Sequence, residues 1–134
     1  MSLPERVRSF LEPARFATIA TVNADGSPQQ AVVWYLLRGD ALVVNSLVGR
    51  RWPTNLQRDP RFSLVVEDGL AYVALSGTAE ALDDPAQAQA DIAEMARRYE
   101  TAEEAERLIR DRFTPQHRVS FRLRVRRVVE HWEG

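Results

Sequence analysis

Residues 16–46 of the chain read FATIATVNADGSPQQAVVWYLLRGDALVVNS. Three stretches in it are rich in β-branched and other apolar residues, which favours extended strands: 16–22, 29–37 and 41–46. Between them lie residues 23–26 and 38–40, which contain the Asn, Asp and Gly residues typical of tight turns. Three strands at such short spacing predict an antiparallel meander.

Three further strands are predicted downstream, at 62–67, 70–81 and 119–126. The second contains Gly77, which indicates a bulge or a bend where a barrel turns a corner. The third alternates strictly between apolar residues and Ser or Arg, as expected of a strand with one buried and one exposed face. Six strands with short helices predict a mainly β, antiparallel domain that closes fully or partly into a barrel.

Short helices are predicted before the meander, directly after it and before the last strand. The first begins near Ser2 and Pro4, and the second spans residues 49–58. Asp84 and Thr101 are placed to cap two more. The chain has 134 residues and no repeat or low-complexity segment, which predicts a single domain over residues 1–134.

The composition argues against several classes of protein. There is no cysteine, which removes disulfides, thiolate nucleophiles and Cys-based metal sites. The apolar runs are too short for a membrane span, so the expected location is the cytoplasm. The net charge of −1 does not favour a general nucleic-acid binder. All 18 basic residues are Arg, so a phosphate would be held by guanidinium or backbone N–H groups.

Motifs for hydrolytic or metal chemistry are missing from the sequence. His117 and His131 are its only histidines, and neither has metal-ligand spacing. No nucleophile elbow, dinucleotide-binding fingerprint or P-loop occurs. Asp83 and Asp84 are better explained as helix-cap groups than as an acid–base pair. No catalytic residue and no metal site is therefore assigned.

One segment, residues 45–56, combines features of an anion-binding site. A strand ends at Ser46, Gly49 allows the chain to turn, and Arg50 and Arg51 open a helix. A helix N-terminus presents unpaired N–H groups, and guanidinium groups beside it make a phosphate pocket. The alternative is an exposed basic helix end with Trp52 packed on the barrel. The residues alone leave both interpretations open.

The chain resembles the pyridoxamine 5′-phosphate oxidase-like superfamily of FMN-binding split barrels, and is most similar to its coenzyme F420-dependent (deazaflavin) branch. The resemblance covers residues 3–82, and the terminal strand ending at Trp132 also fits. Its motifs occur in the family's order and spacing: FATIATV at 16–22, DGSPQ at 25–29, VVWY at 32–35, GRRW at 49–52, NL at 55–56, RDPR at 58–61, YV at 72–73 and Gly77.

This resemblance implies a six-stranded antiparallel split β-barrel that forms a homodimer with cofactor sites at the subunit interface. It implies F420, or alternatively FMN, as the cofactor of a flavoprotein-like oxidoreductase that transfers a hydride to or from a small unsaturated substrate. The residues that it places at the cofactor are Arg50 and Arg51 at the phosphate, Ser46 nearby, Gln30, Val32, Val33 and Trp34 along the ring, and Trp52, Asn55 and Tyr72.

Two departures from the family pattern concern the choice of cofactor. Trp52 stands where many relatives have Lys, and Thr54 stands where many have Arg. Both remove positive charge from the anion pocket, which disfavours the acidic tail of F420 and makes FMN a competitor. The groups that would bind the phosphate of pyridoxamine phosphate are not found, so literal pyridoxamine phosphate oxidase activity is not expected.

Two other functions remain open at this point. The first is a non-catalytic protein that stores or delivers FMN or F420. The second is a nucleic-acid-binding module, which is disfavoured because no stacking aromatic alternates with the arginines concerned, Arg122, Arg124 and Arg126.

Overall fold

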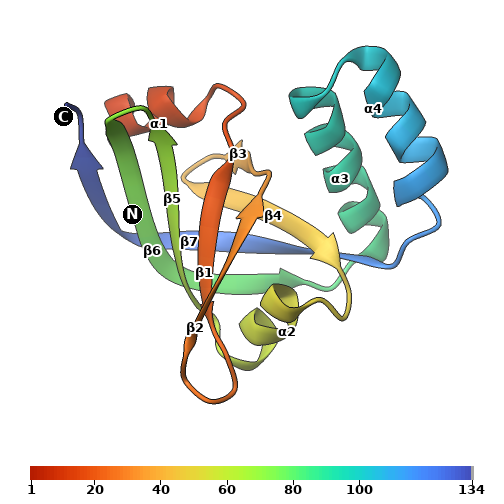
Figure 1. Cartoon of the computed structure of the whole chain (residues 1–134), viewed down its shortest axis with the longest axis horizontal. Helices are drawn as coiled ribbons and strands as arrows, with labels where there is room; N and C mark the ends of the chain where they lie inside the picture. The colour runs from red at the N-terminus through yellow and green to blue at the C-terminus, as the bar shows by residue number, and fades with distance from the viewer. Residues whose placement is uncertain (134) are drawn as a thin grey trace.

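Seven strands form one antiparallel sheet in the computed structural model, which describes residues 1–133. Their order is β2-β1-β5-β6-β7-β4-β3, and the sheet curls into a half-barrel (Figure 1). The mainly β split-barrel architecture is therefore confirmed. The strands are β1 (Ala17–Val22), β2 (Pro28–Val33), β3 (Leu36–Arg38), β4 (Ala41–Leu47), β5 (Arg61–Asp68), β6 (Ala71–Leu82) and β7 (Arg118–His131).

The prediction of six strands was wrong because the strand expected at 29–37 is divided. It breaks at Trp34 and Tyr35 into β2 and β3, which lie at opposite edges of the sheet. The Tyr35 side chain is fully buried, and its hydroxyl donates to the Leu11 carbonyl at 2.9 Å. The Tyr35 N–H donates to the Tyr99 hydroxyl at 3.2 Å. These bonds hold Tyr35 to partners outside the sheet.

The two helices before the last strand begin where the sequence predicts, and their two caps are confirmed. The first helix begins at Glu5 after Pro4, and the second begins at Arg51 rather than at residue 49. Asp84 accepts a hydrogen bond from the Gln87 N–H at 3.1 Å, and Thr101 accepts one from the Glu104 N–H at 3.2 Å. Across residues 1–133, no helix is both long and apolar enough to span a membrane. The helices are α1 (Glu5–Leu11), α2 (Arg51–Arg58), α3 (Pro85–Tyr99) and α4 (Ala102–Leu108), which continues into a π-helical turn at Ile109–Phe113.

Two apolar clusters pack against the sheet, and β4 takes part in both. The larger cluster fills the inside of the curled sheet and includes Leu42 and Val44 of β4. The smaller cluster joins the other face of β4, through Val43, to α3, α4 and the π-helical turn. Figure 1 shows α3 and α4 standing together beside β4. Because both faces of β4 are covered, its last polar residues, Asn45 and Ser46, are also buried.

The predicted bulge at Gly77 is confirmed. The β6–β7 pairing shifts there, since Ser76 pairs with Arg127 while Gly77 pairs with Val125. A Cβ atom at Gly77 would lie 2.0 Å from the Arg124 carbonyl oxygen, so only glycine fits this close approach. In Figure 1, β6 and β7 each run through both halves of the curled sheet.

Replacing Tyr35 with phenylalanine should lower the free energy of unfolding by about 1 kcal/mol at pH 7, because a buried hydrogen bond is lost. The pKa of the Tyr35 hydroxyl is raised to about 12, chiefly because the group is buried. The folded wild type therefore keeps a phenol proton that the unfolded chain releases, so this contribution to stability falls between about pH 10 and pH 12.

Urea denaturation across that pH range should show a smaller loss of stability for Tyr35→Phe than for the wild type. The exposed Tyr72 provides the control, Tyr72→Phe. Equal pH dependence in the wild type and Tyr35→Phe would contradict the assignment to Tyr35. Other titrating groups are shared by both proteins and cancel in the difference.

Candidate functional site

An open pocket of about 290 Å³ lies where the end of β4, the start of α2 and the start of β7 meet. Small-molecule sites commonly have volumes of roughly 300–1,000 Å³, so this pocket is at the lower end of that range. Apolar and aromatic side chains make up most of the wall: Phe16, Val32, Val33, Trp34, Trp52, Ile92, Met95 and Phe113. The polar residues are Asn45, Ser46, Arg50, Arg112, Gln116 and Arg118.

Three arginines line this pocket, Arg50, Arg112 and Arg118. None of them forms an ion pair with a carboxylate of residues 1–133. No Asp or Glu is among the described residues of the wall. Three arginines without an ion-pair partner among the described residues, next to apolar side chains, are a combination that suits an anionic group attached to a ring or chain.

Arg118 is the most buried of the three arginines. Its Nε donates to Asn45 Oδ1 at 2.8 Å, its Nη1 donates to Gln116 Oε1, and its guanidinium carbon lies 4.9 Å from the centre of the Phe113 ring. Burial and, secondly, the charge of Arg50 lower the pKa of Arg118 to about 10. An anion in the pocket would offset both unfavourable effects.

The start of α2 contributes Arg50 to the pocket wall. Arg50 precedes the first helical residue, and Gly49 before it has φ +98°, which permits the turn from β4. Pro53 has no N–H, so the first turn of the helix offers the N–H groups of Arg51 and Trp52. The side chain of Arg51 is exposed and does not line the pocket.

Six of the ten predicted cofactor residues line this pocket: Val32, Val33, Trp34, Ser46, Arg50 and Trp52. Ser46 and Trp52 are buried, and the ring centres of Trp52 and Phe121 are 6.0 Å apart. The packing of Trp52 on the barrel, which the sequence offered as an alternative, is thus real. It coexists with an arginine-lined pocket.

The other four predicted residues, Gln30, Arg51, Asn55 and Tyr72, lie away from the pocket wall. Asn55 is buried and donates to Thr21 Oγ1 at 3.1 Å and to Asn23 Oδ1 at 3.0 Å, so it joins α2 to the end of β1. The Tyr72 ring stacks on His131 with 5.0 Å between centres. Gln30 is exposed on the edge strand β2.

Sequence reasoning missed the pocket residues that come from the C-terminal half. Arg118 belongs to the face of β7 that was expected to be exposed, and no local signal sets it apart from Arg122 or Arg124. The β4–β7 register places Arg118 beside Leu47, and α3 covers this end of the strand. Arg118 can therefore be recognised as a pocket residue only once the packing of α3 is known. The other missed residues of the wall are Phe16, Asn45, Ile92, Met95, Arg112, Phe113 and Gln116.

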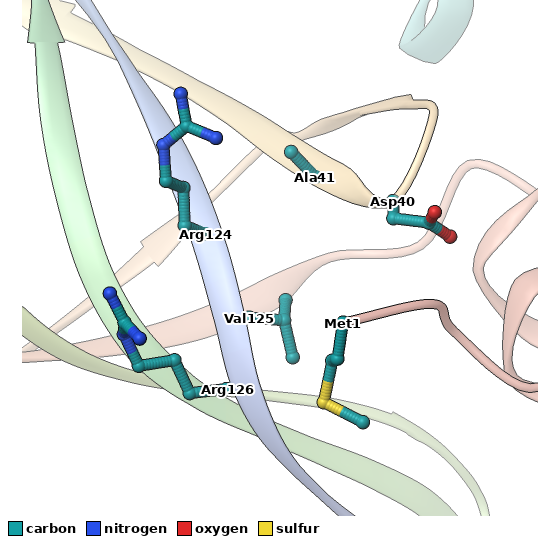
Figure 2. A pocket seen from close by; sticks show the side chains of 6 residues that line it. All are labelled: Met1, Asp40, Ala41, Arg124, Val125 and Arg126. Carbon is teal, nitrogen blue, oxygen red and sulfur yellow. The ribbon is translucent and has the colours of Figure 1, made fainter.

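A second hollow, of about 450 Å³, lies at the other end of the β4–β7 pair (Figure 2). Arg124 and Arg126 project from one side of β7 there, while Met1 and Asp40 lie on the other side. Asp40 accepts hydrogen bonds from the Leu3 N–H at 3.0 Å and from Arg8, so it anchors the N-terminal segment. Arg124 pairs with Glu80 at 3.2 Å. These contacts give Asp40 and Arg124 structural partners.

Solved structures of similar fold cover nearly the whole chain. The conserved hypothetical protein Rv2991 from Mycobacterium tuberculosis has a TM-score of 0.81 at 24% identity, over 99% of this chain and 86% of that one. An F420 reductase has a TM-score of 0.75 at 24% identity, over 95% and 98%. HutZ, the heme storage protein from Vibrio cholerae, has a TM-score of 0.71 at 20% identity, over 99% and 98%.

Comparison at the level of sequence gives the family. A search of curated proteins finds no match. The family model described as pyridoxamine 5′-phosphate oxidase matches residues 3–132, which is nearly the full length of the chain. The chain belongs to the pyridoxamine 5′-phosphate oxidase family.

Proposed function

We propose that this protein is an F420-dependent oxidoreductase, with FMN as the alternative cofactor, that transfers a hydride to or from a small unsaturated organic compound. The observation that carries the proposal is the group Arg50, Arg112 and Arg118, which has no carboxylate partner within residues 1–133 and faces an apolar, aromatic wall. A phosphate-bearing ring cofactor fits this combination of charge and surface.

In this proposal the side chains of the pocket bind, orient and exclude water. Arg50 holds the anionic end of the cofactor at the start of α2. Trp34 stacks on Tyr99 at 5.1 Å, and Tyr99 stacks on Phe16 at 5.9 Å, which gives a rigid aromatic edge beside the ring. When bound, the cofactor supplies the ring that accepts or gives the hydride. The wall contains no His, Asp or Glu of the described residues, so no side-chain proton transfer is assigned.

A second copy of the chain would complete the pocket. Phe16 and Val32 line the pocket yet are 64% and 70% exposed, and β2 is an edge strand of the sheet. Apolar side chains at an unpartnered edge are typical of a surface that another chain covers. Light scattering of the purified protein should give a dimer. A strict monomer that binds the cofactor tightly would contradict an interfacial site.

F420 is preferred over FMN for two reasons. A structural neighbour is an F420 reductase, and three free arginines suit a cofactor with more than one anionic group. Against it, Trp52 and Thr54 replace basic residues that are common in relatives. Titration of the apo-protein with F420 and with FMN, side by side and followed by fluorescence, decides between them. Binding of neither would contradict the proposal.

A carrier or storage role is the alternative to an enzyme. Stopped-flow reduction of the bound, oxidised cofactor by candidate donors separates the two, since a carrier would show no turnover. Storage of heme, the role described for HutZ, finds less support in this chain. Heme iron is often held by a histidine, but His117 lines another hollow and His131 stacks on Tyr72. If hemin is added and no Soret shift follows, the result argues against heme binding by this protein.

Replacing Arg50 with glutamine should weaken cofactor binding at least tenfold. One charge-assisted hydrogen bond contributes about 1.5–3 kcal/mol, and tenfold corresponds to about 1.4 kcal/mol. Arg127→Gln is the control, because Arg127 is exposed and lies outside the pocket. Fluorescence titration should show an unchanged affinity for Arg127→Gln. Equal losses in the two variants would contradict the assignment of Arg50 to the cofactor.

A further inference from the structure

Arg118 has hydrogen-bond donors to spare inside the pocket. A guanidinium group carries five N–H donors. Within residues 1–133, Arg118 directs one to Asn45 and one to Gln116. The remaining three have no acceptor among the described residues, and the side chain is half-buried. The free donors of this half-buried cation face the open pocket, where they are available to an acceptor group of a ligand.

The side chain that orients Arg118 is itself held by a buried chain of hydrogen bonds. Asn45 accepts from Arg118 through Oδ1 and donates through Nδ2 to Ser120 Oγ at 2.9 Å. Ser120 donates to Asp91 Oδ2 at 2.7 Å. Asp91 pairs through Oδ1 with Arg38, at 2.7 Å from Nη2. Asn45, Ser120 and Asp91 are all buried, so this chain, the Asn45–Asp91 relay, is a fixed part of the core.

The order of groups in the Asn45–Asp91 relay keeps the charge of Arg118 available. The direct partners of Arg118, Asn45 and Gln116, are neutral amides, and the Asp91 carboxylate is three hydrogen bonds away, where Arg38 compensates its charge. An aspartate at the position of Asn45 would form an ion pair with Arg118 and cancel its charge. The relay therefore orients the guanidinium without neutralising it.

We propose that Arg118 is an anion-binding residue of the pocket, which contacts phosphate or carboxylate oxygens of the ligand, and that Asn45, Ser120 and Asp91 are positioning residues for it. The proposal extends the proposed function, because it concerns the same pocket. It assigns anion binding to a second residue, because Arg118 belongs to β7 whereas Arg50 lies at the start of α2.

Arg118→Gln tests the proposal with little disturbance of the fold. Gln Nε2 is as many bonds from the backbone as Arg Nε, so it can still donate to Asn45, while the charge and the free donors are lost. Arg127→Gln on the same strand is the control, because Arg127 is exposed and lies outside the pocket. The probes are FMN, riboflavin, which has the same ring without a phosphate, and inorganic phosphate.

We expect Arg118→Gln to bind FMN at least tenfold more weakly than the wild type, with riboflavin affinity changed less than twofold. That result assigns Arg118 to the cofactor phosphate. Alternatively, the affinity for FMN is unchanged, but inorganic phosphate no longer raises the Tm of the FMN-loaded variant. That result assigns Arg118 to an anionic group of the substrate and not of the cofactor. Unchanged responses to both FMN and phosphate would overturn the proposal and leave the proposed function intact.

Failure of the proposed function can be distinguished from failure of the Arg118 proposal. If the wild type binds neither FMN nor F420, the proposed function fails, and the phosphate-induced rise in Tm still tests Arg118 in the apo-protein. Loss of that rise in Arg118→Gln and its retention in Arg127→Gln support the proposal. No rise in the wild type would overturn it. Without ligand, Arg118→Gln should melt no lower than the wild type, because a half-buried, uncompensated charge is removed.

Ser120→Ala tests the positioning role. It removes the link between Asn45 and Asp91 and should lower the Tm, as any buried polar change would. The informative quantity is the ratio of FMN affinity to riboflavin affinity. A positioning role predicts that this ratio falls at least fivefold, whereas a merely structural role leaves it unchanged. An unchanged ratio would overturn the role of the relay.

Discussion

Replacing Gly77 with alanine should destabilise the folded state by about 3 kcal/mol or more, or prevent folding altogether. The new Cβ would lie 2.0 Å from the Arg124 carbonyl oxygen and 3.1 Å from the Arg126 nitrogen. Both are backbone atoms of β7, so relief requires the bulge between the two longest strands to open. Overpacking against a movable side chain typically costs about 1–3 kcal/mol, and a fixed backbone should cost more.

Gly69→Ala is the matched control for this substitution. Gly69 also receives a Cβ, but no atom lies within 4 Å of it, and only the strain of its positive φ of +63° remains. The expected cost is about 1–2 kcal/mol. Thermal and urea denaturation of both variants give the comparison. A Gly77→Ala protein as stable as Gly69→Ala would show that the strands tolerate a wider separation at the bulge.

Replacing Asp91 with alanine should have the second large effect, about 3 kcal/mol in the free energy of unfolding. The Asp91 carboxylate is 0% exposed and accepts hydrogen bonds from Gln87 and Ser120 as well as pairing with Arg38. Removal of this buried carboxylate leaves the donors of Ser120 and Gln87 without their acceptor, and each buried donor left unsatisfied typically costs about 1–3 kcal/mol. Arg38 keeps Glu94 as a partner, which places the expected value at the lower end.

Glu94→Ala provides a control on the same helix and the same arginine. Glu94 pairs with Arg38 Nη2 at 2.8 Å, against 2.7 Å for Asp91, but its side chain is 59% exposed. Exposed ion pairs contribute about 0–1 kcal/mol, so this variant should be nearly as stable as the wild type. Urea denaturation measures both. Similar losses in the two variants would show that burial does not decide the strength of these pairs.

Elements governed by local signals were predictable from the sequence. The hairpin turns, the caps at Asp84 and Thr101, and the bulge at Gly77 each depend on residues within a few positions, and the structure has all of them. The break at Trp34 and Tyr35 was not predictable. It depends on bonds from Tyr35 to Tyr99 and Leu11, which are distant in sequence, whereas the local composition favours one continuous strand.

The candidate site divides in the same way. Arg50 and Ser46 follow from a strand that ends in a polar residue and a helix that opens on arginine. Arg118 alternates with apolar residues as exposed residues do, and it is half-buried only because α3 and the π-helical turn pack beside the first residues of β7. The alternation of apolar and polar residues along one strand does not predict which helix will cover the outer face of that strand.

The position of β7 in the sheet has a consequence for synthesis of the protein. β7 lies between β6 and β4, yet it leaves the ribosome after both of them. Until then, β6 and β4 expose unpaired edges, and the β3–β4 hairpin has no strand to join it to the rest of the sheet. The nascent chain therefore passes through a stage that is prone to aggregation and suited to chaperone binding. Aggregation through unpaired strand edges is therefore expected mainly during translation, before β7 joins the sheet.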